Sequence, residues 1–229
     1  MPKRKLPLAS IRKHAKHAAA NGAIRTKANG FLGHPKSIAE QVGSFVMQQV
    51  PNAKVHEDHK PMMFRRNAAE LMKTITPVWK FHCVDRSTLA LSLLHAADVH
   101  AWAVRGLGYS NIHGKWIFHD AVEFVHQGKV YLLDFFFDEN RFTITQGSAE
   151  SQFNKTHPGR HDIILRGIDA HHMGIKNWEE YERFSNRFFK DHQKELQENL
   201  ARVRKMVRAG LIPKEVASEL ISRSQRHVD

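Results

Sequence analysis

One continuous stretch, residues 83–137, constrains the fold more than any other part of the chain. It contains one apolar helical run and three runs with the length and composition of strands: Cys83–Ala97, Val99–Leu107, Lys115–His126 and Lys129–Phe137. Only Gln127 and Gly128 separate the last two runs, and so short a link joins neighbouring antiparallel strands. The stretch therefore predicts an α+β fold in which a helix packs on an antiparallel sheet.

The flanking sequence divides the rest of the chain. Residues 1–35 predict a basic, flexible tail that is largely disordered or partly helical. Residues 36–175 predict the folded core, and residues 176–229 a helical C-terminal extension. Periodicity predicts further helices and strands in these parts: helices Lys36–Val50 and Asn67–Thr76, strands Arg141–Thr145 and Asp162–Arg166, a long helix from Asn177 that Gly210 ends, and a last helix Lys214–Ser224. With 229 residues, 41% of them hydrophobic, the chain is long enough for one good-sized core.

Cys83 is the only cysteine, and it begins the central helix. A lone cysteine excludes an internal disulfide and a multi-cysteine zinc site, and it favours a reducing compartment such as the cytoplasm. A cysteine attacks as its thiolate, and the unpaired N–H groups at a helix start favour that negative charge. Cys83 is therefore a candidate nucleophile, although a lone cysteine more often serves as a small buried hydrophobe.

His119 and Asp134 lie on the two strands of the predicted hairpin. A two- or four-residue loop centred on Gln127 and Gly128 makes His119 face Phe136, and it puts Asp134 on the same face as His119. Diagonal neighbours of this kind lie about 7–8 Å apart, within reach of their side chains. A histidine can then accept the thiol proton while a carboxylate orients its ring.

Four motifs follow one another in this region: a cysteine opening a Leu/Ala-rich helix, a strand ending in glycine, a His-x-x-Val-Glu strand and a Gly…Tyr-x-Leu-Asp strand. They occupy Cys83–Leu94, Val99–Gly106, His119–Glu123 and Gly128–Asp134. In order and spacing they resemble the catalytic core of the transglutaminase-like superfamily of papain-like thiol enzymes. The match covers about a quarter of the chain, and it departs from the family pattern at Asp98, at Asp120–Ala121 and at Phe135, where glycine, an aromatic residue and proline are common.

The resemblance implies a papain-like or transglutaminase-like core with a catalytic triad. Cys83 would be the nucleophile, His119 the base and Asp134 the group that orients the base. It further implies a cysteine-dependent acyl-transfer enzyme without a cofactor that acts on a protein or peptide amide. Transfer of the acyl group to water would make the protein a peptidase or deamidase, and transfer to an amine a transglutaminase. The hydrolase is favoured, because the resemblance is to the minimal core of the superfamily.

The sequence leaves alternatives open for three features of this site: the base, the partner of Asp134 and the oxyanion donor. His113 is a rival to His119 as the base, although it falls in a turn rich in glycine and asparagine. Asp134 stands in an apolar strand and needs a buried partner, which could be an arginine instead of the histidine. Trp79 is a candidate oxyanion donor through its indole N–H, with packing in the core as the simpler role.

The net charge of +12 is concentrated at the start of the chain. Residues 1–39 contain nine Lys and Arg side chains and no acid, and Lys3, Arg4, Lys5, Arg12 and Lys13 are candidate contacts to nucleic acid or another polyanion. The same composition suits a solvated tail and also resembles an organelle transit peptide. The alternative function is therefore a catalytically inactive basic binding protein that uses the tail and the fold to bind nucleic acid or a protein partner.

No apolar run approaches the length of a membrane span, and no membrane partner is expected. Two histidine pairs, His157/His161 and His171/His172, suggest a metal. No accompanying carboxylate or histidine set at helical spacing specifies such a site, so no metal site is predicted.

Overall fold

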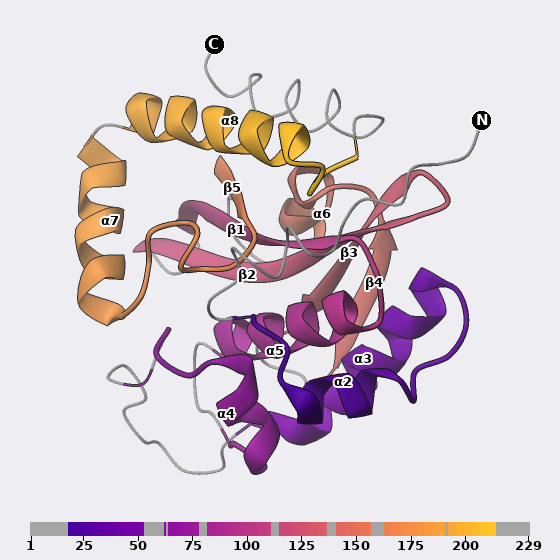
Figure 1. Cartoon of the computed structure of the whole chain (residues 1–229). Coiled ribbons are helices and arrows are strands. Elements are labelled where there is room, and N and C mark those ends of the chain that lie inside the picture. Colours follow the sequence, from indigo (N-terminus) through magenta and orange to yellow (C-terminus); the bar gives the residue numbers. More distant parts are fainter. Residues whose placement is uncertain are drawn as a thin grey trace.

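The computed structural model describes residues 18–52, 62, 64–77, 82–110, 115–136, 141–156, 163–190 and 192–213 (Figure 1). Its helices are α2 (Gly22–Ala28), α3 (Pro35–Gln49), α4 (Ala68–Lys73), α5 (His82–Ala96), α6 (Ala149–Thr156), α7 (Trp178–Lys190) and α8 (His192–Arg208). Its strands are β1 (Ala101–Ser110), β2 (Lys115–His126), β3 (Lys129–Phe135), β4 (Phe142–Gln146) and β5 (Ile163–Gly167).

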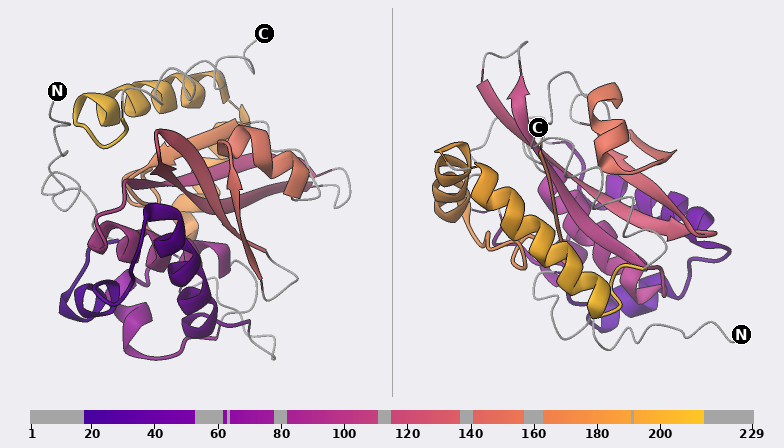
Figure 2. Two further views of the ribbon diagram at one scale, coloured as in Figure 1. Left: turned by 90° about the vertical axis from the view of Figure 1, so that its right-hand side faces the viewer. Right: turned by 90° about the horizontal axis from the view of Figure 1, so that it is seen from above.

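The strands of the described residues form one sheet in the order β4-β3-β2-β1-β5, and every neighbouring pair is antiparallel. Helices α2 to α5 gather on one side of the sheet and α8 lies on the other, while α7 stands at one end (Figures 1 and 2). This arrangement confirms the predicted α+β fold and the antiparallel sheet. No helix in the described part of the chain has the length and apolar character needed to cross a bilayer.

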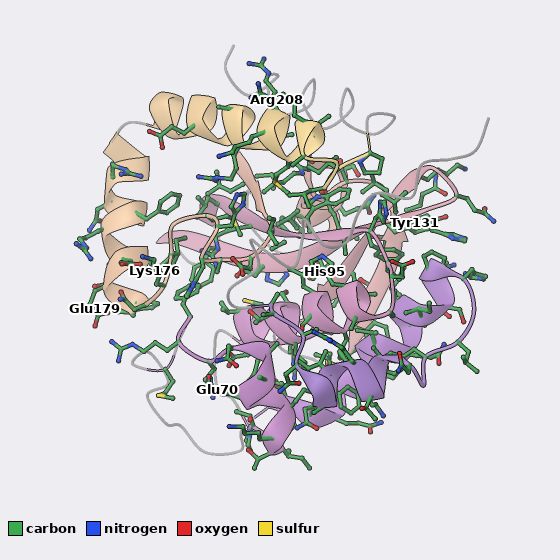
Figure 3. All side chains as sticks on the ribbon, viewed as in Figure 1. Glu70, His95, Tyr131, Lys176, Glu179 and Arg208 are labelled. Atoms are coloured by element: carbon green, nitrogen blue, oxygen red, sulfur yellow. The ribbon has the colours of Figure 1, made fainter. Side chains whose placement is uncertain are left out.

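Helix α5 occupies the centre of the helical layer and packs against β1, β2 and β3. Its apolar side chains are almost completely buried, among them Leu89, Leu93 and Leu94. At its C-terminal end, His95 Nε2 donates to the carbonyl oxygen of Ala101 over 2.8 Å, which ties the helix to the start of β1 (Figure 3). Its polar side chains Asp85, Arg86, Ser87, Thr88, Ser92 and His95 are buried as well, so the helix is enclosed by the rest of the fold. This property makes α5 the core helix of the fold.

The turn between β2 and β3 has positive φ angles at both of its residues, 50° at Gln127 and 75° at Gly128. Two successive positive φ angles define a two-residue type I′ hairpin, whose twist matches that of the strands. The turn sets Val122 opposite Leu133 and His126 opposite Lys129, which is the predicted register.

The predicted elements of the core and extension are confirmed within a few residues wherever the structure describes them. The helix expected from Asn177 is divided into α7 and α8, and the helix expected at Lys214–Ser224 lies outside the described residues. Helix α6 was not predicted, because Ala149–Thr156 is mostly polar and lacks a clear apolar stripe.

Residues 18–35, part of the predicted basic tail, contain a helix. Helix α2 forms there, capped by the side chain of Asn21, which accepts from the backbone N–H of Ile24 over 2.9 Å. Ile24 and Ala28 are buried against the core. Only two apolar residues anchor this helix, so the basic composition masked a weak apolar pattern. Residues 1–17 lie outside the described residues.

Replacing Ile24 by alanine tests whether α2 is part of the core. The side chain is fully buried, so its truncation is expected to lower the free energy of unfolding by about 2–4 kcal/mol. Urea denaturation measures the change, with exposed Thr26→Ala on the same helix as a control expected to stay within about 0.5 kcal/mol. Equal, small effects of both substitutions would contradict the burial of α2.

Replacing Gly43 by alanine tests the close approach of α3 to β4. A Cβ atom at this position would come within 2.5 Å of the Phe142 ring, so the ring or the helix must move. We expect a loss of about 1–3 kcal/mol in the free energy of unfolding, despite the higher helix propensity of alanine. Gly22→Ala is the matched control, because a Cβ there has no neighbour within 4 Å; thermal or urea unfolding should show no loss for that variant.

Candidate active site

Cys83 is the second residue of α5 and lies at the end of the helix that carries the positive pole of its dipole. The residue is buried, with 7% of its surface exposed, and it forms no disulfide. The residues that follow it in the helix, the charged Asp85 and Arg86 among them, are buried as well, which holds the sulfur in one place. The predicted position of a cysteine at a helix start is therefore confirmed.

His119 on β2 and Asp134 on β3 are also brought together. His119 Nε2 lies 2.5 Å from Asp134 Oδ1, and Asp134 is completely buried. The β2–β3 register is the cause, because extending it beyond Val122 and Leu133 places both residues on one face. The partner of the buried Asp134 is thus a histidine, one of the two alternatives that the sequence left open.

Cys83 is close enough to His119 to raise the pKa of the ring, through a hydrogen bond and through its charge. With Nε2 held by Asp134, Nδ1 is the ring nitrogen that can face the sulfur. Burial disfavours the charged ring, but the charges and hydrogen bonds of Asp134 and Cys83 outweigh this and raise the pKa of His119 to about 10. At neutral pH the ring therefore holds a proton between a carboxylate and a sulfur.

Phe153 of α6 packs against the ring of His119. Its ring meets the His119 ring edge-on, with 5.3 Å between the centroids, and Phe153 is itself buried. The start of α5, the strands β2 and β3, and α6 thus all meet at His119. Packing of this kind restricts the ring to one orientation and reduces its contact with water.

Two further charged residues flank Cys83 on α5. Burial raises the pKa of Asp85 to about 6, although the nearby Arg66, its ion-pair partner, lowers it. Burial lowers the pKa of Arg86 to about 10, and the charge of Cys83 partly offsets this. Arg86 Nε donates to the carbonyl oxygen of Val50 over 2.9 Å, and Nη1 reaches that of Phe136 at 3.5 Å, which joins the helix start to the end of β3.

A second buried ion pair, Arg105 with Asp120, was missed by the sequence analysis. Arg105 Nε and Nη2 donate to the two carboxylate oxygens of Asp120, each over 2.5 Å, and Arg105 is completely buried. The two residues face each other across β1 and β2, next to the pair Gly106–His119. The signal in the sequence was Arg105 itself, a single charged residue in the otherwise apolar first part of β1. Its partner could not be named, because it depends on the β1–β2 register.

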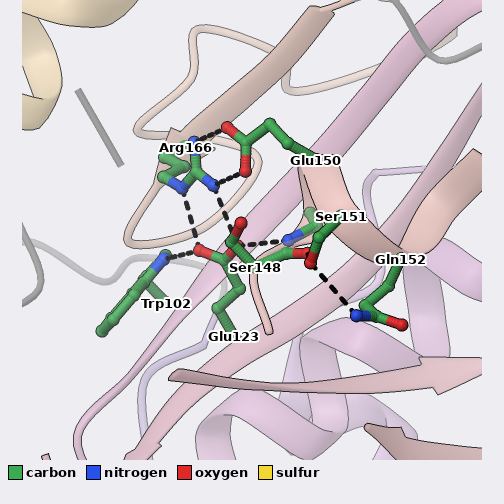
Figure 4. A network of polar contacts seen from close by, with 8 residues as sticks. Trp102, Glu123, Ser148, Glu150, Ser151, Gln152 and Arg166 are labelled. Atoms are coloured by element: carbon green, nitrogen blue, oxygen red, sulfur yellow. Dashed lines mark hydrogen bonds and ion pairs between the residues drawn. The ribbon is translucent and has the colours of Figure 1, made fainter. Parts of the chain in front are cut away.

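A third charged cluster, also missed, connects β2 and β5 with α6 (Figure 4). Arg166 donates to Glu123 over 2.8 and 2.9 Å and to Glu150 over 2.6 and 2.5 Å. Glu123 also accepts from the indole N–H of Trp102 over 2.5 Å and from the backbone N–H of Ala149 over 2.7 Å. These bonds fix the start of α6, the helix that carries Phe153.

The remaining predicted site residues lie outside the described residues. They are Trp79, the rival base His113, the histidines His157 and His161, and the basic residues Lys3, Arg4, Lys5, Arg12 and Lys13. Within the described residues, no group of three or more His, Cys, Asp or Glu side chains is placed to hold a metal ion. The groups that meet near Cys83 in the described structure are its thiol, the imidazole of His119 and the carboxylate of Asp134.

Comparisons with models of protein families, with curated proteins and with solved structures gave no match for this chain.

The pH dependence of stability tests the charged state of His119. Because the pKa of His119 is raised from 6.5 to about 10 by folding, the imidazolium stabilises the fold fully below about pH 6.5 and loses this effect as the pH rises toward 10. The difference in unfolding free energy between the wild type and His119→Gln should therefore be largest near pH 6 and shrink toward pH 10. Urea denaturation at pH 6, 8 and 10 measures it.

His126→Gln is the control for that experiment, because His126 is a second buried histidine on β2. Burial, with the nearby His34 and Lys36, lowers the pKa of His126, so its effect should not change between pH 7 and 10. A His119→Gln difference that stays constant or grows over this range would contradict a charged His119.

Proposed function

We propose that the protein is a cysteine-dependent acyl-transfer enzyme with a transglutaminase-like, papain-like core, and that it hydrolyses a protein or peptide amide. The contact series Cys83–His119–Asp134 carries the proposal. It joins a sulfur at a helix start, a ring that holds a proton, and a buried carboxylate 2.5 Å from that ring. Thiol enzymes use this combination to activate a nucleophile.

In the first half of the reaction, the Cys83 thiolate attacks the carbonyl carbon of the amide and pushes the carbonyl electrons onto oxygen. The helix start, with its N–H groups, suits the negative charge that develops there. When the oxyanion collapses, the C–N bond breaks, and His119 gives its Nδ1 proton to the leaving amine. The acyl group is then held as a thioester on Cys83.

In the second half, His119 takes a proton from a water molecule, whose oxygen attacks the thioester carbon. The C–S bond breaks, a carboxylic acid is released, and the thiolate–imidazolium pair is restored. Asp134 keeps the ring oriented throughout, and its charge compensates the imidazolium in each half. An amine in place of water would give a transglutaminase by the same steps. Water is favoured, because the resemblance covers only the minimal core of that superfamily.

An activated ester tests the proposal without a known substrate. The wild-type protein is expected to release a burst of about one p-nitrophenolate per chain from p-nitrophenyl acetate, followed by slow turnover, as acyl-enzymes do. Cys83→Ser should abolish the burst. Mass spectrometry should find one acetyl group on the peptide that contains Cys83.

The role of His119 separates a catalytic thiol from an ordinary one. His119→Gln should slow both the burst and alkylation by iodoacetamide at pH 6 by about tenfold or more, whereas His126→Gln should leave both unchanged. Methylamine added to the acylated protein shows whether acyl transfer to an amine competes with water. Equal reactivity of the wild type and His119→Gln would rule out the proposed catalytic role of His119. The protein would then have the fold without the enzymatic activity.

A further inference from the structure

Strand β4 forms one border of the sheet, with β3 on one side and no other described strand beyond it (Figure 1). A border strand carries backbone N–H and C=O groups that can pair with another chain, and proteins prevent this with charged side chains, proline or a β-bulge. β4 has none of these. Its sequence is Phe-Thr-Ile-Thr-Gln, and its pairing with β3 runs without interruption from Phe142 to Gln146. The opposite border strand, β5, includes the charged Arg166 and packs against α8.

The backbone groups of β4 alternate between β3 and the outside of the sheet. Just after the strand, the backbone N–H of Gly147 donates to the carbonyl oxygen of Val130 over 2.9 Å, which makes these two residues a hydrogen-bonded pair. In an antiparallel ladder every second residue forms such a pair. Counting back from Gly147, Thr145 and Thr143 bond to β3, and the N–H and C=O groups of Ile144 between them point away from it.

The outward backbone groups of Phe142 and Ile144 have no hydrogen-bond partner among the described residues. At Gln146 the outward carbonyl oxygen accepts from the side-chain amide of Gln152 over 3.1 Å. Four of the five side chains of β4 are half-buried and only that of Gln146 is exposed, so the strand itself is held in the fold. An ordered strand with unpaired backbone groups is a template on which a further strand can add.

The hydroxyl groups of Thr143 and Thr145 lack partners as well. Both Oγ1 atoms are buried and without a hydrogen bond in the described structure. Buried polar atoms of this kind are rare in native proteins. The two residues are two positions apart and therefore lie on one face of the sheet. A strand that places a threonine opposite each of them would supply the missing partners, because threonine pairs form hydrogen bonds across antiparallel strands.

The β4 strand of a second copy of this chain meets these requirements. In an antiparallel pair centred on Ile144, this residue faces itself and exchanges two backbone hydrogen bonds with its equivalent. Thr143 then faces Thr145 of the other copy, twice, at non-hydrogen-bonded positions where side chains lie closest. Phe142 faces Gln146 in the same way. No charged side chains of the two strands meet, which suits self-association in a chain with a net charge of +12.

We propose that β4 is a dimerisation edge, at which two copies of the chain join their sheets into one. The contact is isologous, because both copies contribute the same residues. It goes beyond the proposed function and does not depend on it, since Asp134 and His119 lie on β3 and β2, inside the seam. Two five-residue strands bury a small area, so the association belongs to the weak class of interfaces, with a dissociation constant of about 1–100 µM.

Sedimentation velocity of the full chain between about 1 and 200 µM tests the dimer directly. The mass should rise with concentration from that of one chain, 26.4 kDa, toward twice this value. A mass that stays at one chain over the whole range would overturn the proposal and leave the edge to an extended segment of another protein.

Ile144→Pro tests whether the dimer uses this edge. Proline removes an N–H that points outward and none that bonds to β3, and the preceding residue can remain extended. We expect association to weaken about tenfold or more, because two backbone hydrogen bonds are lost from each dimer. The matched control Ile144→Val keeps the N–H and should stay within about twofold of the wild type. Circular dichroism shows whether each variant is folded, and equal association of a folded Ile144→Pro variant would overturn the proposal.

Cysteine cross-linking tests the register and does not require the proline variant to fold. In a Cys83→Ser background, which removes the only native thiol, chains with Thr143→Cys are mixed with chains with Thr145→Cys and oxidised. Non-hydrogen-bonded partners lie about 4.5 Å apart at Cα, within the range of a disulfide. The mixture should give several times more cross-linked dimer than either variant alone. No cross-link in the mixture, or equal yields in all three samples, would contradict pairing centred on Ile144.

Discussion

The register of the β2–β3 hairpin is the constraint on which the candidate site depends. A turn with positive φ at both Gln127 and Gly128 leaves no extra residue in either strand, and side chains therefore alternate in step across the pair. His119 and Asp134 share a face for this reason alone. A shift of one residue would turn Asp134 away and leave a buried carboxylate without its partner. The turn thus sets which side chains of β2 and β3 meet at the candidate site.

Several charged groups are buried in this structure, and each of those named here has a partner on a different strand or helix. Asp134 meets His119, Arg105 meets Asp120, and Arg166 joins Glu123 to Glu150. Such pairs are expensive to bury, and breaking one leaves an uncompensated charge. They therefore hold the strands and α6 in one arrangement around His119. The proposed acyl-transfer chemistry needs this rigidity, because a thiolate and an imidazolium form a productive pair only at fixed separation.

Local signals in the sequence were sufficient for much of this fold. The apolar run of α5, the alternation in β2 and the two-residue link after it each depend on neighbours in the chain, and all were confirmed. Helix α2 was missed because only Ile24 and Ala28 hold it to the core, within a strongly basic segment. The Arg105–Asp120 pair was missed because the two residues meet only when β1 and β2 are aligned, and no register was predicted for that pair of strands.

The sequence by itself determined the order of the elements and the parity of the hairpin, because both follow from hydrophobic periodicity and from the conformation of two turn residues. It also named Cys83, His119 and Asp134 through their spacing. The tertiary structure alone decided that the start of α5 meets the ring of His119 and that Phe153 packs against that ring. These contacts join residues far apart in the chain, and they arise from packing, which no local pattern in one sequence records.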